Sequence, residues 1–77
     1  MDKVFERVCA IMATTFNVPA ASITPATTPE TLEAWDSMGH LNLILALEDE
    51  LKISISPEDG ERMKDVETIV KVIRPLL

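Results

Sequence analysis

The sequence is poor in the residues that mark several classes of protein. Its 77 residues include one cysteine, one histidine, two glycines and no tyrosine. A lone cysteine cannot form an internal disulfide, and one cysteine with one histidine is too small a ligand set for a zinc site. Two glycines are also too few for a glycine-rich phosphate-binding loop. We therefore expect no metal ion, and a reducing, cytoplasmic environment.

Basic residues are scarce as well, with 7 lysines and arginines against 13 aspartates and glutamates and a net charge of −6. This balance excludes a typical nucleic-acid binder and disfavours attraction to an anionic membrane, whereas it favours partners with basic surfaces. The N-terminal residues are charged, and no apolar run is long enough to span a bilayer. We expect one domain over residues 1–77, without a signal peptide or stable membrane insertion, and a monomer.

Apolar residues make up 47% of the chain, and their spacing predicts helices. The first helix is expected over residues 2–16, with Asp2 as its N-cap and Cys9 as a small, semi-buried hydrophobe. Its predicted core face contains Val4, Val8, Ile11, Met12, Thr15 and Phe16.

Residues 17–35 contain three prolines among serines and threonines, which predicts a long loop. We expect Ile23, Leu32 and Trp35 to hold this loop against the core. A single helical turn is possible at residues 29–32, with Thr28 as its cap.

The residues that follow predict a helix over 37–51 that has two apolar faces. Asp36 is a good N-cap, which places Ser37 at the first helical position. One face is a core stripe formed by Leu43, Ile44, Leu47 and Leu51. The other consists of Met38, Leu41 and Leu45 and is continued by Glu48. Since a helix at the edge of a small domain normally buries one stripe, the second indicates either more core or a surface covered by another molecule.

The remaining residues predict a short link and two further helices. Residues 52–55 are expected to be extended, and Ser56 with Pro57 starts a short helix over residues 57–62. Met63 is expected to pack inward. Asp65 caps the last helix, which ends near Pro75 and has Val66, Ile69, Val70 and Ile73 on its core face. The fold class is therefore all-α, a four-helix bundle with three long helices, one short helix and a long first loop.

A Ser–His hydrolase is the enzymatic alternative, because Ser37 and His40 are three residues apart on a predicted helix. We discount it, since Asp36 is used as a cap and we expect no pocket in so short a chain. His40 is expected to be solvated or to face a partner. No catalytic residue is assigned, and an ordinary helix-start role for Ser37 stays open beside a role as an attachment point.

The run Asp36-Ser37-Met38, followed by an apolar helix that ends in Glu48-Asp49-Glu50-Leu51, resembles the acyl carrier proteins. The order and length of the predicted helices match over nearly the whole chain. The resemblance implies a non-enzymatic carrier, with 4′-phosphopantetheine transferred from coenzyme A to Ser37 and acyl groups held on its thiol as thioesters.

The resemblance also implies partners. These are a phosphopantetheinyl transferase and acyl-loading or acyl-processing enzymes of fatty acid, polyketide or other specialised pathways. Met38, Leu41 and Leu45 would meet these enzymes, while Glu48 and Asp49 would face their basic residues. Ile55 and Met63 match positions near the arm or the acyl cavity, and plain core positions explain them equally well.

Residues around Ser37 depart from the usual fatty-acid-synthesis pattern. Trp35, Gly39 and His40 are more typical of discrete carriers for dedicated pathways, and Gly39 and His40 lighten the acidic surface near Ser37. D-alanyl carriers share the Asp-Ser-Met form, so a D-alanyl or other aminoacyl carrier remains open. A carrier fold that binds partners without a prosthetic group is the other alternative.

Overall fold

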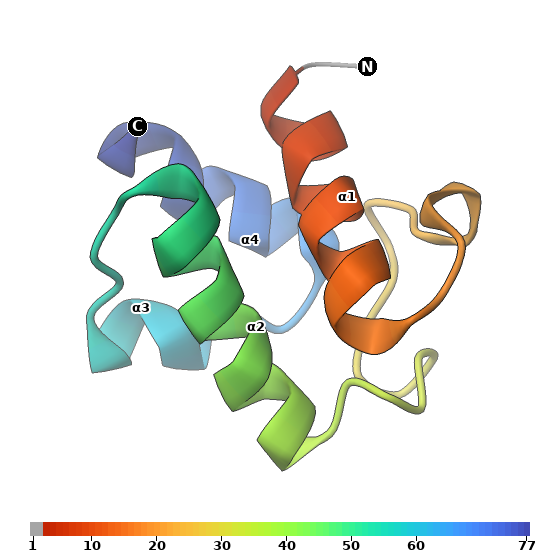
Figure 1. Cartoon of the computed structure of the whole chain (residues 1–77). Coiled ribbons are helices and arrows are strands. Elements are labelled where there is room, and N and C mark those ends of the chain that lie inside the picture. The colour runs from red at the N-terminus through yellow and green to blue at the C-terminus, as the bar shows by residue number, and fades with distance from the viewer. Residues whose placement is uncertain (1–2) are drawn as a thin grey trace.

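The computed structural model describes residues 3–77, which form four α-helices and two short 3₁₀ turns, without a strand. The α-helices are α1 (Lys3–Phe16), α2 (Ser37–Leu51), α3 (Pro57–Arg62) and α4 (Val66–Ile73), and the turns are η1 (Ala20–Ser22) and η2 (Arg74–Leu76). In Figure 1, α1 and α2 lie beside each other, with α4 behind them and the short α3 below it. The all-α, four-helix prediction is confirmed, while the expected cap at Asp2 lies outside the described residues.

The core lies between α1, α2 and α4 and is closed by the long loop. Its fully buried large side chains are Val8, Met12, Trp35, Leu43, Leu47, Met63, Val66, Ile69 and Ile73. The predicted inner face of α1 is correct, although Val4, Ile11 and Thr15 are only half-buried. Cys9 is buried, deeper than the semi-buried position expected, and burial raises the pKa of its thiol, with a smaller contribution from the charge of Glu6.

The segment between α1 and α2 starts at the lower end of α1, runs up beside that helix and comes back down to the start of α2 (Figure 1). Ile23 and Trp35 are buried and Leu32 is half-buried, which confirms all three as anchors. The expected turn also forms, since the backbone N–H groups of Thr31 and Leu32 both donate to the Thr28 carbonyl at 3.0 Å.

The same loop caps α4 with its backbone, which the sequence did not indicate. The N–H of Val66 donates to the Thr27 carbonyl at 3.1 Å, and that of Glu67 donates to the Pro25 carbonyl at 3.0 Å. The Asp65 carboxylate accepts from the Thr68 N–H at 2.7 Å. Three N–H groups that a helix start leaves unpaired are thereby satisfied, and the loop is fastened to the far side of the fold.

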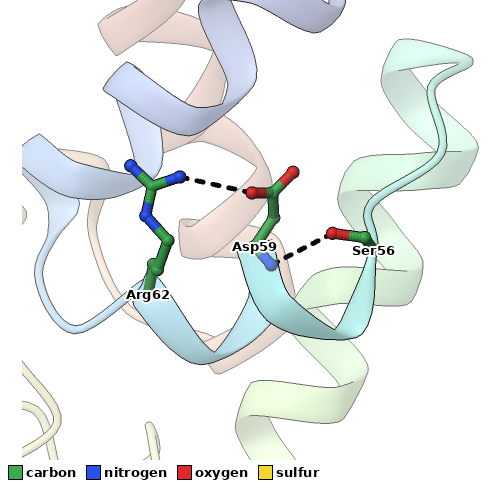
Figure 2. Close-up of polar contacts among 3 residues, drawn as sticks. All are labelled: Ser56, Asp59 and Arg62. Atoms are coloured by element: carbon green, nitrogen blue, oxygen red, sulfur yellow. Dashed lines mark hydrogen bonds and ion pairs between the residues drawn. The ribbon is translucent and has the colours of Figure 1, made fainter.

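The short helix α3 is stabilised by polar contacts of its own residues and its N-cap. Ser56 Oγ accepts from the Asp59 N–H at 3.1 Å, and Arg62 pairs with Asp59 at 3.4 Å (Figure 2). Gly60 is buried, whereas most other residues of α3 are exposed. Ile55 and Met63, on either side of the helix, enter the core. Because α3 carries no large apolar side chain, contacts from neighbouring elements decide how tightly it packs.

Candidate functional site

The site begins at the N-terminus of α2. Asp36 has extended backbone angles, and its Oδ1 accepts from the Gly39 N–H at 2.8 Å, which is the predicted capping contact. Ser37 is therefore the first residue of the helix, and it is exposed. The first-turn N–H groups and the helix dipole make this end favourable for a negatively charged group bound to the serine.

Gly39 brings the first turn of α2 into the closest backbone contact of the site. A Cβ on Gly39 would overlap the carbonyl oxygen of Ala34 and lie 3.0 Å from Cε1 of Phe16. Gly39 is buried. Gly39 therefore also has a packing role: its small size lets the loop and the end of α1 close over the start of α2.

The two apolar stripes of α2 separate as expected. Leu43, Leu47 and Leu51 are buried and Ile44 is half-buried, whereas Met38, Leu41 and Leu45 are 68%, 58% and 63% exposed. Of the two explanations for the second stripe, additional core is excluded within residues 3–77. The stripe forms an apolar surface that starts one residue after Ser37.

An open cleft of about 950 Å³ lies beside Ser37. Its lining comes from the end of the loop, the first turns of α2, and α3 with the residues after it. The lining residues are Pro29, Glu33, Trp35, Asp36, Ser37, His40, Leu41, Gly60, Glu61, Met63 and Lys64. The expectation that the chain has no pocket is wrong, because parts of the loop, α2 and α3 together line this open cleft.

His40 is not the freely solvated side chain expected, because both of its ring nitrogens have partners within the fold. It is half-buried, its Nδ1 lies 2.9 Å from the Trp35 indole Nε1, and its Nε2 lies 2.8 Å from the Gly60 carbonyl oxygen. The two rings are nearly parallel, with an interplanar angle of 15° and centroids 6.1 Å apart. The expectation for His40 is wrong because Trp35, although only five residues away, lies outside α2, and Gly60 is twenty residues away in α3, so helix periodicity reports neither contact.

The acidic end of α2 divides into structural and exposed groups. Glu48 is half-buried, and its Oε2 accepts from the backbone N–H of Ile55 at 2.8 Å, which ties α2 to the link before α3. Asp49 and Glu50 are exposed. Contacts of Glu48 and Asp49 with a partner's basic residues stay a prediction, and for Glu48 the structure adds a contact inside the fold.

A family model described as a phosphopantetheine attachment site matches residues 6–73. An acyl carrier protein of Helicobacter pylori strain J99 is 40% identical over 70 residues, covering 90% of this chain and 88% of its own length. That of Thermosynechococcus vestitus is 35% identical over 73 residues, covering 94% and 89%. The chain belongs to the acyl carrier proteins. The prosthetic group attached in this family is 4′-phosphopantetheine, as the resemblance implied.

The fold of this acyl carrier protein agrees with a solved structure. It superposes on the solution NMR structure of a holo acyl carrier protein from Geobacter metallireducens with a TM-score of 0.87 and 24% identity, covering 97% of this chain and 86% of that one.

Met63 both enters the core and lines the cleft, while Ile55 is a core residue away from the cleft lining. Within residues 3–77, no helix has the length and apolar character needed to cross a bilayer.

Proposed function

We propose that Ser37 is the residue that carries the 4′-phosphopantetheine arm. The observation that carries this proposal is the exposed hydroxyl at the first position of α2, next to the Asp36 cap and at the edge of the open cleft. A phosphodiester there would lie at the positive end of the helix dipole. The bound arm would supply a terminal thiol that holds an acyl group as a thioester.

The protein then acts as a carrier rather than an enzyme. Catalysis by a Ser37–His40 pair would need an imidazole nitrogen free to accept the serine proton. Both nitrogens of His40 are already engaged, by Trp35 and by Gly60. The chain therefore presents its cargo to other proteins, which we infer to be a phosphopantetheinyl transferase and acyl-loading and acyl-processing enzymes in the cytoplasm.

Partner enzymes would dock on the exposed stripe of Met38, Leu41 and Leu45. This stripe adjoins Ser37, so a protein seated on it would have its own active site near the arm. Asp49 and the net charge of −6 favour a basic surface on the partner. Exposed ion pairs of this kind add little affinity each, and they speed and orient association.

Intact-mass measurement tests the attachment site. Unmodified wild type, Ser37→Ala and Ser54→Ala are each incubated with coenzyme A and a broad-specificity phosphopantetheinyl transferase. Ser54 is an exposed serine on the link before α3 and serves as the matched control. A gain of one phosphopantetheine on wild type and Ser54→Ala, with none on Ser37→Ala, is the expected result. A gain on Ser37→Ala would place the site elsewhere.

A carrier fold that only binds partners is the second candidate, and the exposed apolar stripe favours it equally. It predicts no mass gain on any variant, together with partner binding that is unchanged by Ser37→Ala. The cargo is a separate question: loading of the modified chain with acyl or with D-alanyl and other aminoacyl groups distinguishes an acyl carrier from an aminoacyl carrier.

A further inference from the structure

Three elements meet at the His40 ring. Trp35 belongs to the end of the loop, His40 to α2 and Gly60 to α3, and hydrogen bonds of 2.9 and 2.8 Å join them in that order. We refer to these three residues as the bridge. None of the roles given above to Ser37, the apolar stripe or the acidic residues uses it.

The bridge fixes the chemical form of His40. An indole N–H can only donate, so Nδ1 must be the acceptor from Trp35. The Gly60 carbonyl can only accept, so Nε2 must carry the proton that it receives. The bridge therefore requires the neutral Nε2–H tautomer, with each nitrogen in one role.

The bond to Gly60 acts on α3, a helix that buries little of its own surface. In α3, Gly60 alone is buried, and the helix has six residues with no large apolar side chain. A Cβ on Gly60 would lie 2.9 Å from Cδ1 of Ile44, so the α3 backbone approaches α2 closely at this residue. The contacts in Figure 2 are made within α3 and its cap, whereas the His40 bond reaches α3 from another helix.

All three bridge residues line the cleft beside Ser37. Trp35 contributes to the lining from the loop and Gly60 from α3, so the bridge joins both of these elements to the helix that starts at Ser37. We propose that His40 is a positioning residue that holds α3 against α2 and thereby sets the width of this cleft. Loss of the Gly60 bond releases α3, and the cleft widens next to Ser37.

This inference concerns the unmodified chain, and only its consequence for an attached arm rests on the proposed function. The test is therefore made without the arm. Amide hydrogen exchange is measured by NMR on full-length wild type, His40→Asn, His40→Gln and His40→Ala. Asn places an amide oxygen near the position of Nδ1, while Gln places an amide N–H near the position of Nε2, so the two variants each keep one half of the bridge.

The Trp35–His40 bond can be observed separately, because the chain has one tryptophan and therefore one indole N–H resonance. We expect His40→Asn to keep the indole protected and to speed exchange at residues 59–63 by about 2- to 12-fold, the effect of one lost hydrogen bond. His40→Gln should speed exchange of the indole N–H and leave residues 59–63 protected, and His40→Ala should speed exchange at both places. Ring nitrogen shifts of wild type should show the Nε2–H tautomer.

Three results would overturn the proposal. One is exchange at residues 59–63 that stays at the wild-type rate in both the Asn and the Ala variants. Another is that His40→Gln and His40→Asn speed amide exchange at residues 59–63 equally, which would mean that the imidazole acts through its size and not through its hydrogen bond. The third is the Nδ1–H tautomer in wild type. Failure of Ser37 to accept the arm would leave these measurements unaffected, so the two proposals fail separately.

Discussion

The carbonyl oxygen of Ala34 fills the space that a side chain on Gly39 would need. This contact places the loop directly against the first turn of α2, one turn away from the Asp36 cap. Phe16 closes the same space from the end of α1, and its ring lies 6.2 Å from that of Trp35. The position of Ser37 at the surface therefore depends on the absence of a side chain two residues later.

We predict that Gly39→Ala destabilises the fold by roughly 1–3 kcal/mol or more, because backbone atoms cannot yield as a flexible side chain can. Gly60→Ala is the matched control. Its Cβ meets only the end of Ile44, and the cost of moving that side chain is offset by the better helix propensity of alanine. Urea unfolding should show Gly60→Ala within about 1 kcal/mol of wild type. Equal losses for both variants would contradict the close-contact argument.

The two stripes of α2 should respond differently to truncation. Leu47 is fully buried, so Leu47→Ala is expected to lower the free energy of unfolding by roughly 2–5 kcal/mol. Leu41 is 58% exposed, so Leu41→Ala should change stability by less than about 0.5 kcal/mol and instead raise the KM for transfer of phosphopantetheine by the transferase. Denaturant unfolding and loading kinetics measure the two effects, and similar destabilisation by both changes would refute the separation.

The cap at Asp65 should make stability depend on pH. The Thr68 N–H, bonded to the carboxylate at 2.7 Å, lowers the pKa of Asp65. A lowered pKa in the folded state means that the contribution is complete above the unfolded-state pKa and is lost as the pH falls through the folded-state pKa. Asp65→Ala is therefore expected to cost about 0.5–2 kcal/mol at neutral pH.

The difference in the free energy of unfolding between wild type and Asp65→Ala should become smaller in acid. Urea unfolding of both proteins at neutral pH and near pH 3, about the range where an aspartate takes up its proton, measures this change. Asp65→Asn is the control, because its amide oxygen also caps a helix and does not titrate in this range. A gap that is constant with pH would show that the ionised carboxylate adds nothing to the cap.

Cys9 should react slowly in the folded protein. It is 6% exposed, and burial raises the pKa of its thiol, so the reactive thiolate is scarce at neutral pH. We expect alkylation of the unmodified chain to be much slower in the fold than in denaturant, because burial both raises the pKa of the thiol and restricts access of the reagent. The unmodified chain is required because an attached arm would add a second thiol. Rapid labelling under native conditions would mean that α1 opens locally.

Local chemistry along the chain was sufficient to predict the four α-helices, although not the two 3₁₀ turns. Caps at Asp36, Ser56 and Asp65 and the apolar spacing along each helix placed α2 and α3 at their observed bounds. These signals act within a few residues, through side-chain bonds to the next turn and through the periodicity of a helix. The exposed stripe beside Ser37 was predictable for the same reason, because a helix that is apolar on two sides can bury only one against a small core.

Contacts between distant segments decided the rest. The cleft, the close approach of Gly39 to Ala34, and the Trp35–His40–Gly60 bridge all depend on how the loop and α3 come to rest against α2. Trp35 is five residues from His40 but outside α2, and Gly60 lies in another helix, so helix periodicity does not report the bridge. A glycine has the same sequence signal whether it faces solvent or a carbonyl oxygen. Only the packed arrangement of α1, the loop, α2 and α3 determines what surrounds each of these residues.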